Sequence, residues 1–121
     1  MKRRIHSFRY AFRGIGTVIK SEINMQIHLV VALLVIVAGL VLNISVIEWL
    51  LCLICFALVL GAEMLNTAIE KAVDLASPDY HELAGKAKDI AAGAVLIVSI
   101  LVAVVGLIIF VPKIWELLFV R

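Results

Sequence analysis

Three carboxylates are spaced along residues 61–74 so that one face of a helix would carry all of them. Glu70 and Asp74 follow Glu63 by seven and eleven residues. At about 100° per residue, both fall within about 20° of Glu63 around an α-helix. Asn66 and Thr67 flank that line and add an amide and a hydroxyl. Hard oxygen ligands of this kind suit Mg²⁺, and with nearby basic side chains they suit phosphoryl transfer.

The helix that would carry this face begins in an apolar segment. Residues 49–62 contain no charged side chain and run directly into Glu63. Two other uncharged segments, 23–47 and 90–112, each exceed the roughly 20 residues that a membrane-spanning helix needs. The sequence of 121 residues is 64% hydrophobic, with a mean hydropathy of +1.16, which excludes an ordinary soluble globular protein. Carboxylates at or near membrane depth are costly and are commonly functional.

We therefore expect an all-α integral membrane protein that forms a single domain over residues 1–121. The predicted transmembrane helices cover about 23–47, 49–74 and 87–112. Residues 3–20 place apolar side chains at alternating steps of three and four among basic ones. This pattern predicts an N-terminal amphipathic helix that lies on the membrane surface.

Lysine and arginine are distributed unevenly along the chain. Six precede the first apolar segment, three lie around the connection between the second and third, and two follow the third. Because basic residues concentrate on the cytoplasmic side, we expect the N-terminus and residues 75–89 in the cytoplasm and the C-terminus outside. The net charge of +2 gives no indication of a nucleic-acid partner.

The residues by themselves leave three uses open for the carboxylate face. Its acids could pair with basic residues across a small helical bundle, line a path for ions or protons, or bind a metal in an enzyme. The first and third apolar segments carry no charge across their outer halves, so no continuous polar path is visible. The usual nucleotide-binding loops are absent, so any ATP would have to be bound by these carboxylates and by basic side chains.

The pattern Glu63-Met-Leu-Asn66-Thr-Ala-Ile-Glu70-x-x-x-Asp74 resembles the signature of the small prokaryotic diacylglycerol kinase and undecaprenol kinase family. The resemblance extends over nearly the whole chain. It includes Glu22-x-Asn24-x-x-x-His28, Tyr80-His81-Glu82-Leu-Ala and Lys86-Ala-Lys88-Asp89. Ile47-Glu-Trp49, the Ala-Ala-Gly-Ala run and the segment ending at Lys113 are more similar to the undecaprenol kinase branch of Gram-positive bacteria.

The resemblance implies a homotrimer in the bacterial plasma membrane, with sites between subunits and MgATP as phosphoryl donor. By position, Glu63 matches the catalytic base that contacts the lipid substrate, and Glu22 and Glu70 match the magnesium ligands. The positions that match nucleotide contacts are Arg3, Tyr10, Glu22, Glu70, His81, Lys88 and Asp89. Asn66 and Asp74 match supporting polar positions.

The function expected from this resemblance is transfer of the ATP γ-phosphate to the hydroxyl of undecaprenol at the cytoplasmic face. The alternative within the class is a diacylglycerol kinase that makes phosphatidic acid. The alternative from another class is a small ion-conducting or structural helical bundle. The choice between the two lipids depends on how apolar surfaces accept one chain or two, and the sequence leaves it open.

Overall fold

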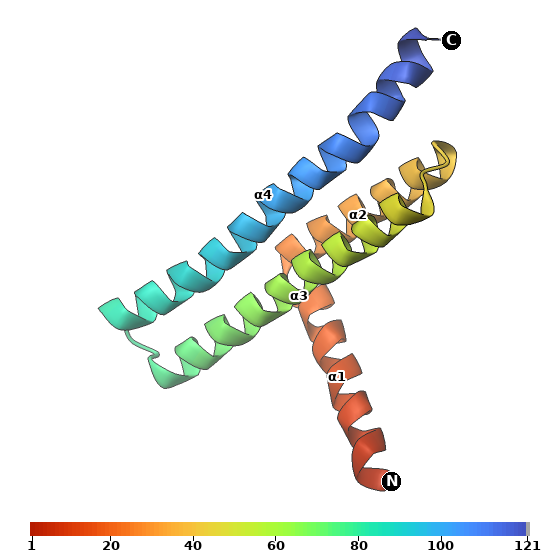
Figure 1. Cartoon of the computed structure of the whole chain (residues 1–121). Helices are drawn as coiled ribbons and strands as arrows, with labels where there is room; N and C mark the ends of the chain where they lie inside the picture. The colour runs from red at the N-terminus through yellow and green to blue at the C-terminus, as the bar shows by residue number, and fades with distance from the viewer. Residues whose placement is uncertain (121) are drawn as a thin grey trace.

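The computed structural model describes residues 1–120, which form four α-helices joined by short connections (Figure 1). They are α1 (Lys2–Ser21), α2 (Ile23–Val41), α3 (Val46–Ala76) and α4 (Glu82–Phe119). Helices α2, α3 and α4 are each long and apolar enough to cross a membrane. The expectation of an all-α protein with three such helices is confirmed.

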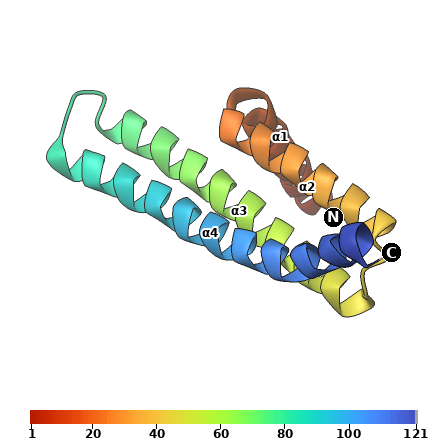
Figure 2. The same cartoon turned by 90° about the horizontal axis from the view of Figure 1, so that it is seen from above.

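Helix α3 is the central element of the fold. It runs antiparallel to α4 along most of its length and lies beside α2, as two perpendicular views show (Figures 1 and 2). Helix α3 also contacts α1, whereas α2 and α4 make no backbone contact with each other within residues 1–120. The helix that carries the carboxylate face is thus the one that every other helix contacts.

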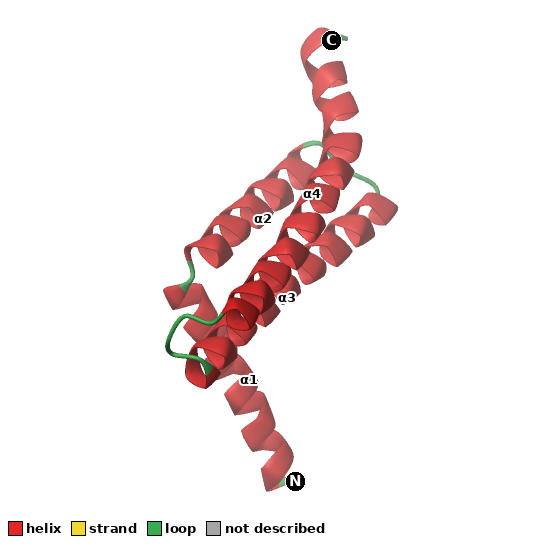
Figure 3. Ribbon diagram, turned by 90° about the vertical axis from the view of Figure 1, so that its left-hand side faces the viewer, coloured by secondary structure: helices red, strands yellow, loops and turns green. Residues whose placement is uncertain are grey.

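Helix α1 ends at a single extended residue. Glu22 has φ −107° and ψ 114°, so the chain changes direction there and α1 leads away from the other helices (Figure 3). The Gln26 side chain donates a hydrogen bond of 3.1 Å to the carbonyl of Ile19. This bond satisfies a carbonyl of the last turn, one of the groups that a helix end leaves without a partner. Val18, in the same turn, is buried.

The turn between α2 and α3 comes earlier than the predicted span 23–47 implied. Helix α2 ends at Val41, and Asn43 adopts a left-handed conformation with φ 50°, which asparagine tolerates better than most residues. Ser45 then caps α3 and forms a capping box with Glu48. Residues 46 and 47 therefore begin α3 instead of ending α2.

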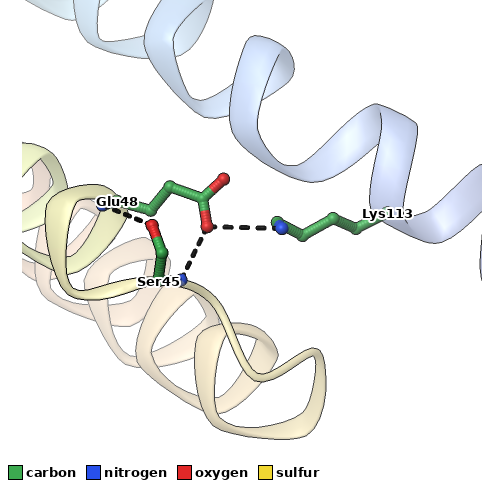
Figure 4. A network of polar contacts seen from close by, with 3 residues as sticks. All are labelled: Ser45, Glu48 and Lys113. Carbon is green, nitrogen blue, oxygen red and sulfur yellow. Dashed lines mark hydrogen bonds and ion pairs between the residues drawn. The ribbon is translucent and has the colours of Figure 1, made fainter.

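A polar network fixes this turn to the far end of α4, as Figure 4 shows. Glu48 accepts a hydrogen bond of 2.7 Å from the Ser45 backbone N–H, and the Ser45 hydroxyl accepts one of 3.2 Å from the Glu48 N–H. The same Glu48 carboxylate lies 3.3 Å from the ammonium group of Lys113. The start of α3 is thereby held to α4.

Helix α4 is longer than the predicted range 87–112. It begins at Glu82, where the His81 side chain accepts a hydrogen bond of 3.1 Å from the Leu83 N–H as a cap. It continues through Pro112 to Phe119, although proline lacks the N–H that an interior helical position normally donates. The helix thus extends at both ends beyond the predicted range. The membrane boundaries themselves stay predictions.

The buried apolar core lies close to the α2–α3 turn. Ile44, Cys52 and Ile109 are buried together, and half-buried aromatic rings, including Trp49, pack against them. Both cysteines are free thiols, and Cys52 serves as a packing residue of this core. The core therefore holds α3, α4 and the turn together at the end of the bundle away from the carboxylates.

Gly39 gives a test of this packing. A Cβ there would lie 2.7 Å from Cη2 of Trp49 and 3.0 Å from Cδ1 of Ile44. We expect Gly39→Ala to lower the free energy of unfolding by about 1–3 kcal/mol, as overpacking usually does. The measurement is thermal unfolding of the purified protein in detergent micelles. Gly106→Ala is the matched control, because nothing lies within 4 Å of its added Cβ.

A second substitution shows whether the ring causes the loss. Removing the indole in Gly39→Ala/Trp49→Leu should make the alanine less destabilising than it is beside the native Trp49. If Gly39→Ala proves as stable as Gly106→Ala, the predicted clash is wrong.

Candidate functional site

The polar face of α3 contains the most deeply buried polar side chains in the described part of the chain. Glu63, Asn66 and Thr67 expose only 1%, 8% and 2% of their surface. They lie three and four residues apart, which places them on adjacent turns of one helical surface. Burial of a carboxylate among apolar helices is unfavourable unless a partner or a function offsets it.

These side chains lack hydrogen-bond partners within residues 1–120. Oε2 of Glu63, Oδ1 of Asn66 and Oγ1 of Thr67 are buried and make no hydrogen bond. A buried polar atom without a partner costs about 1–3 kcal/mol, and more when the group is charged. Three such atoms on one surface indicate a site that is completed by a bound molecule or by another subunit.

Within residues 1–120, the one basic side chain within 4 Å of the Glu63 carboxylate comes from α2. Nε2 of His28 lies 3.9 Å from Oε2 of Glu63, beyond hydrogen-bond length but within the range of an ion pair. The His28 side chain is 21% exposed, against 2% for that of Glu63. His28 appears in the sequence only as part of the Glu22-x-Asn24-x-x-x-His28 motif, and no role followed from that position.

Exposure increases along the carboxylate face toward the α3–α4 loop. Glu63 is fully buried, Glu70 is half-buried and Asp74 is exposed. The predicted common face therefore spans environments of different polarity. A group at Glu63 is shielded from water, whereas Glu70 and Asp74 can meet a soluble molecule.

Asp74 is ion-paired across the hairpin with Lys88 of α4. The antiparallel course of the two helices brings these residues together, although fourteen positions separate them in the sequence. Both lie beside a pocket of about 220 Å³ at the α3–α4 loop, whose polar lining also includes Ser77, Tyr80 and His81. This pocket combines one cation with carboxylate, hydroxyl and imidazole groups at the end of the bundle.

The other predicted nucleotide contacts are not gathered at this pocket within a single chain. Arg3 and Tyr10 are exposed on α1, which leads away from the other helices (Figure 3). Tyr10 instead lies beneath the guanidinium group of Arg13, 5.8 Å from the ring centroid. Asp89 is exposed on α4, next to Lys88. The structure thus brings Asp74, His81 and Lys88 together and leaves the α1 residues apart.

The two predicted metal ligands lie on different parts of the fold, one at the α1–α2 break and the other on α3. Glu22 is half-buried at the α1–α2 break, where it accepts a hydrogen bond of 3.1 Å from Ser21, and Glu70 is half-buried on α3. Within residues 1–120, no three His, Cys, Asp or Glu side chains are grouped so that they could hold a metal ion together. Magnesium commonly takes only one or two carboxylates and completes its shell with phosphate oxygens and water. The oxygen donors present therefore fit Mg²⁺ bound together with a phosphate ligand.

An apolar cavity of about 160 Å³ lies toward the middle of the bundle, beside His28. Its lining comes from α2, α3 and α4 and consists mainly of small or branched aliphatic side chains, with Phe56 on α3 and Ser99 on α4. The cavity lies between α2 and α4, whose backbones stay apart within residues 1–120, with α3 beside both. An apolar group could thus lie beside the imidazole that faces Glu63.

Comparison with known proteins identifies the family of this chain. The family model for prokaryotic diacylglycerol kinase matches residues 9–110, which include all the carboxylates of the face. The chain is 40% identical to the undecaprenol kinase of Bacillus subtilis over 93% of its own length and 92% of that protein. It is 39% identical to the diacylglycerol kinase of Synechocystis, over 93% of this chain and 65% of that one.

The relationship extends to less similar members. The chain is 37% identical to the diacylglycerol kinase of Escherichia coli K12, over 85% of this chain and 84% of that protein. The matches thus cover nearly all of α1 to α4 and involve relatives with two different named substrates. On this basis the chain belongs to the prokaryotic diacylglycerol kinase family.

Proposed function

We propose that this protein is a membrane lipid kinase that transfers the γ-phosphoryl group of ATP to the hydroxyl of undecaprenol at the cytoplasmic face. The observation that carries the proposal is the fully buried Glu63, whose Oε2 has no hydrogen-bond partner within residues 1–120 and which shares a helical face with the more exposed Glu70. Family membership supports the reaction class. The similarity to an undecaprenol kinase over nearly the full length of both chains supports the choice of lipid.

Glu63 is the general base in this proposal. Its carboxylate takes the proton of the lipid hydroxyl as that oxygen attacks the γ-phosphorus, and its burial keeps water from competing as an acceptor. Asn66, one turn away, has a side-chain oxygen without a hydrogen-bond partner among the described residues, and this oxygen can orient the same hydroxyl or a phosphate-bound water. A lipid alcohol already lies in the membrane. A base within a spanning helix can therefore reach its hydroxyl directly, and no additional domain is needed to shield the reaction from water.

Glu22 and Glu70 would hold Mg²⁺, which supplies charge neutralisation on the phosphates when bound. Lys88 contributes a positive charge beside the phosphates, and Asp74 positions it through the ion pair. The remaining proposed nucleotide contacts are Arg3, Tyr10, His81 and Asp89. Positioning and charge stabilisation of this kind make up most of the catalysis in phosphoryl transfer.

The active form would be a homotrimer with its sites between subunits. Large apolar side chains are exposed on all four helices, so a single chain leaves extensive surface for lipid or for other subunits. Because α1 leads away from the pocket of its own chain, Arg3 and Tyr10 would reach a nucleotide bound to a neighbouring subunit (Figure 3). The exposed basic and aromatic side chains of α1 would also hold that helix at the inner membrane surface.

The apolar cavity beside His28 would receive part of the lipid chain next to the hydroxyl. Its volume of about 160 Å³ and its narrow aliphatic lining suit a short length of one hydrocarbon chain. A polyprenol has a single chain, whereas diacylglycerol has two. Either lipid could place one chain there, so the choice of undecaprenol rests on the similarity to an undecaprenol kinase, and diacylglycerol is the second candidate because several relatives are named for it.

A phosphotransfer assay tests the proposal directly. The purified chain is incubated with radiolabelled ATP and Mg²⁺ in mixed micelles that contain undecaprenol or diacylglycerol. We expect labelled undecaprenyl phosphate to form faster than labelled phosphatidic acid. Faster labelling of diacylglycerol would select the second candidate, and no labelling of either would favour an ion-conducting or structural bundle.

Substitution of Glu63 and of Glu70 should change different kinetic properties. We expect Glu63→Gln to lower turnover by roughly 10²–10⁴-fold, the usual contribution of a general base, while MgATP binding stays near normal. Glu70→Gln should weaken MgATP binding, with partial recovery at high Mg²⁺. Steady-state kinetics and nucleotide titration of both variants separate the two effects. Loss of nucleotide binding in Glu63→Gln together with merely slower turnover in Glu70→Gln would invert the assignment.

The proposed orientation can be tested by labelling single cysteines in intact cells. Ile47 is exposed at the start of α3, and Asp79 is exposed in the α3–α4 loop. A membrane-impermeant thiol reagent should label Ile47→Cys from outside and label Asp79→Cys only after the cells are permeabilised. The unsubstituted chain measures background labelling of Cys52 and Cys55. The opposite pattern would place the kinase site on the outer face and refute the topology.

A further inference from the structure

The burial of Glu63 creates a problem for repeated turnover. Each transfer breaks the O–H bond of the lipid alcohol and leaves one proton on the base. Glu63 is only 1% exposed and its Oε2 has no hydrogen-bond partner within residues 1–120, so it has no direct contact with water through which to lose that proton. Another group must accept the proton before the next lipid can react.

His28 is the group placed to do this. Its Nε2 lies 3.9 Å from Oε2 of Glu63, and it is the only ionisable side chain on α2. Within residues 1–120, neither His28 nor Glu63 forms any other ion pair. The next carboxylates along the two helices, Glu22 and Glu70, are six and seven residues away, more than one helical turn.

The exposure of His28 differs from that of Glu63 in the direction that a proton exit requires. The imidazole is 21% exposed, whereas the carboxylate beside it is 2% exposed. The two nitrogens of a neutral imidazole can act in sequence, because one accepts a proton while the other releases its own. His28 therefore links the buried carboxylate to a position that is partly exposed on the single chain, six residues from Glu22 at the α1–α2 break.

We propose that His28 is the positioning residue that orients Glu63 and relays its proton to solvent, an inference that rests on the proposed role of Glu63 as base. The Glu63 O–H bond breaks and a bond from hydrogen to Nε2 forms, after which Nδ1 releases its proton to water. Water-mediated transfer of the remaining ring proton from Nε2 to Nδ1 then restores the starting tautomer. One proton leaves per lipid phosphorylated, which is the proton that the alcohol lost. A small side-chain rotation would shorten the 3.9 Å separation to hydrogen-bond length.

Imidazole rescue distinguishes a relay from a merely structural role. His28→Ala removes the imidazole and leaves space beside Glu63. Measured at saturating MgATP and lipid in a buffer free of imidazole, its kcat should fall by roughly 10²-fold, the lower end of the range for acid–base groups, with an unchanged KM for MgATP. Added imidazole should then raise kcat in proportion to the concentration of its neutral form.

Two further variants serve as controls. His6→Ala removes an exposed histidine of α1, and its kcat should match that of the wild-type chain with or without imidazole. His28→Gln keeps a polar side chain of similar length that cannot carry a proton, so it should be slow and should not respond to imidazole. If His28→Ala fails to fold, the kcat of His28→Gln still shows whether the imidazole is needed for turnover.

Wild-type kcat in either His28 variant would overturn the inference. So would slow variants whose kcat ignores imidazole and whose defect is a raised KM for MgATP, because that pattern belongs to a structural role. The proposed function fails separately: a wild-type chain that phosphorylates no lipid overturns it together with the relay. An active wild-type chain with unaffected His28 variants overturns the relay alone.

Discussion

The burial of one carboxylate within an apolar helical pair is the constraint on which the rest of this structure depends. Glu63 is the largest fully buried side chain in the described part of the protein, and burial of a charge is among the most unfavourable events in folding. Such a group persists only where the surrounding helices are held by other interactions. The apolar core of Ile44, Cys52 and Ile109 lies near the opposite end of α3, where packing can offset this penalty without contacting the site.

The central position of α3 turns this burial into a gradient of polarity. Every other helix contacts α3, so its middle is shielded while its end near the α3–α4 loop reaches water. Glu63 and Asp74 belong to one helical face yet lie in opposite environments. In the proposed kinase, this separation lets a lipid hydroxyl meet a base in a dry setting while MgATP stays at the aqueous end. The Ser45–Glu48–Lys113 network holds the far end of α3 to α4 and so helps to fix the register between them.

Much of this arrangement could be predicted from the sequence because it depends on local periodicity and composition. The 3.6-residue repeat places Glu63, Glu70 and Asp74 on one face, and the uncharged runs indicate three long apolar helices. The element boundaries were less accurate. Helix α2 ends at Val41 because the left-handed Asn43 and the Ser45 cap redirect the chain, whereas the uncharged segment that continues to residue 47 put the end of the predicted span several residues too late. Family membership was also recognisable from the polar motif, and the relatives confirm it.

The sequence by itself determined which residues are polar, which helix carries them and which face they share, because the face of a residue depends only on its position in the repeat of a single helix. Only the tertiary structure decided which of them are dry and which meet across helices. The approach of His28 to Glu63 and the pairing of Asp74 with Lys88 depend on how separate helices rotate and slide against each other. That rotation is set by side-chain packing between α2, α3 and α4. Because these helices have similar aliphatic surfaces, a single hydropathy pattern is compatible with several ways of packing them. For the same reason Arg3 and Tyr10 were grouped with the pocket by motif, whereas the extended Glu22 turns α1 away from it within the chain.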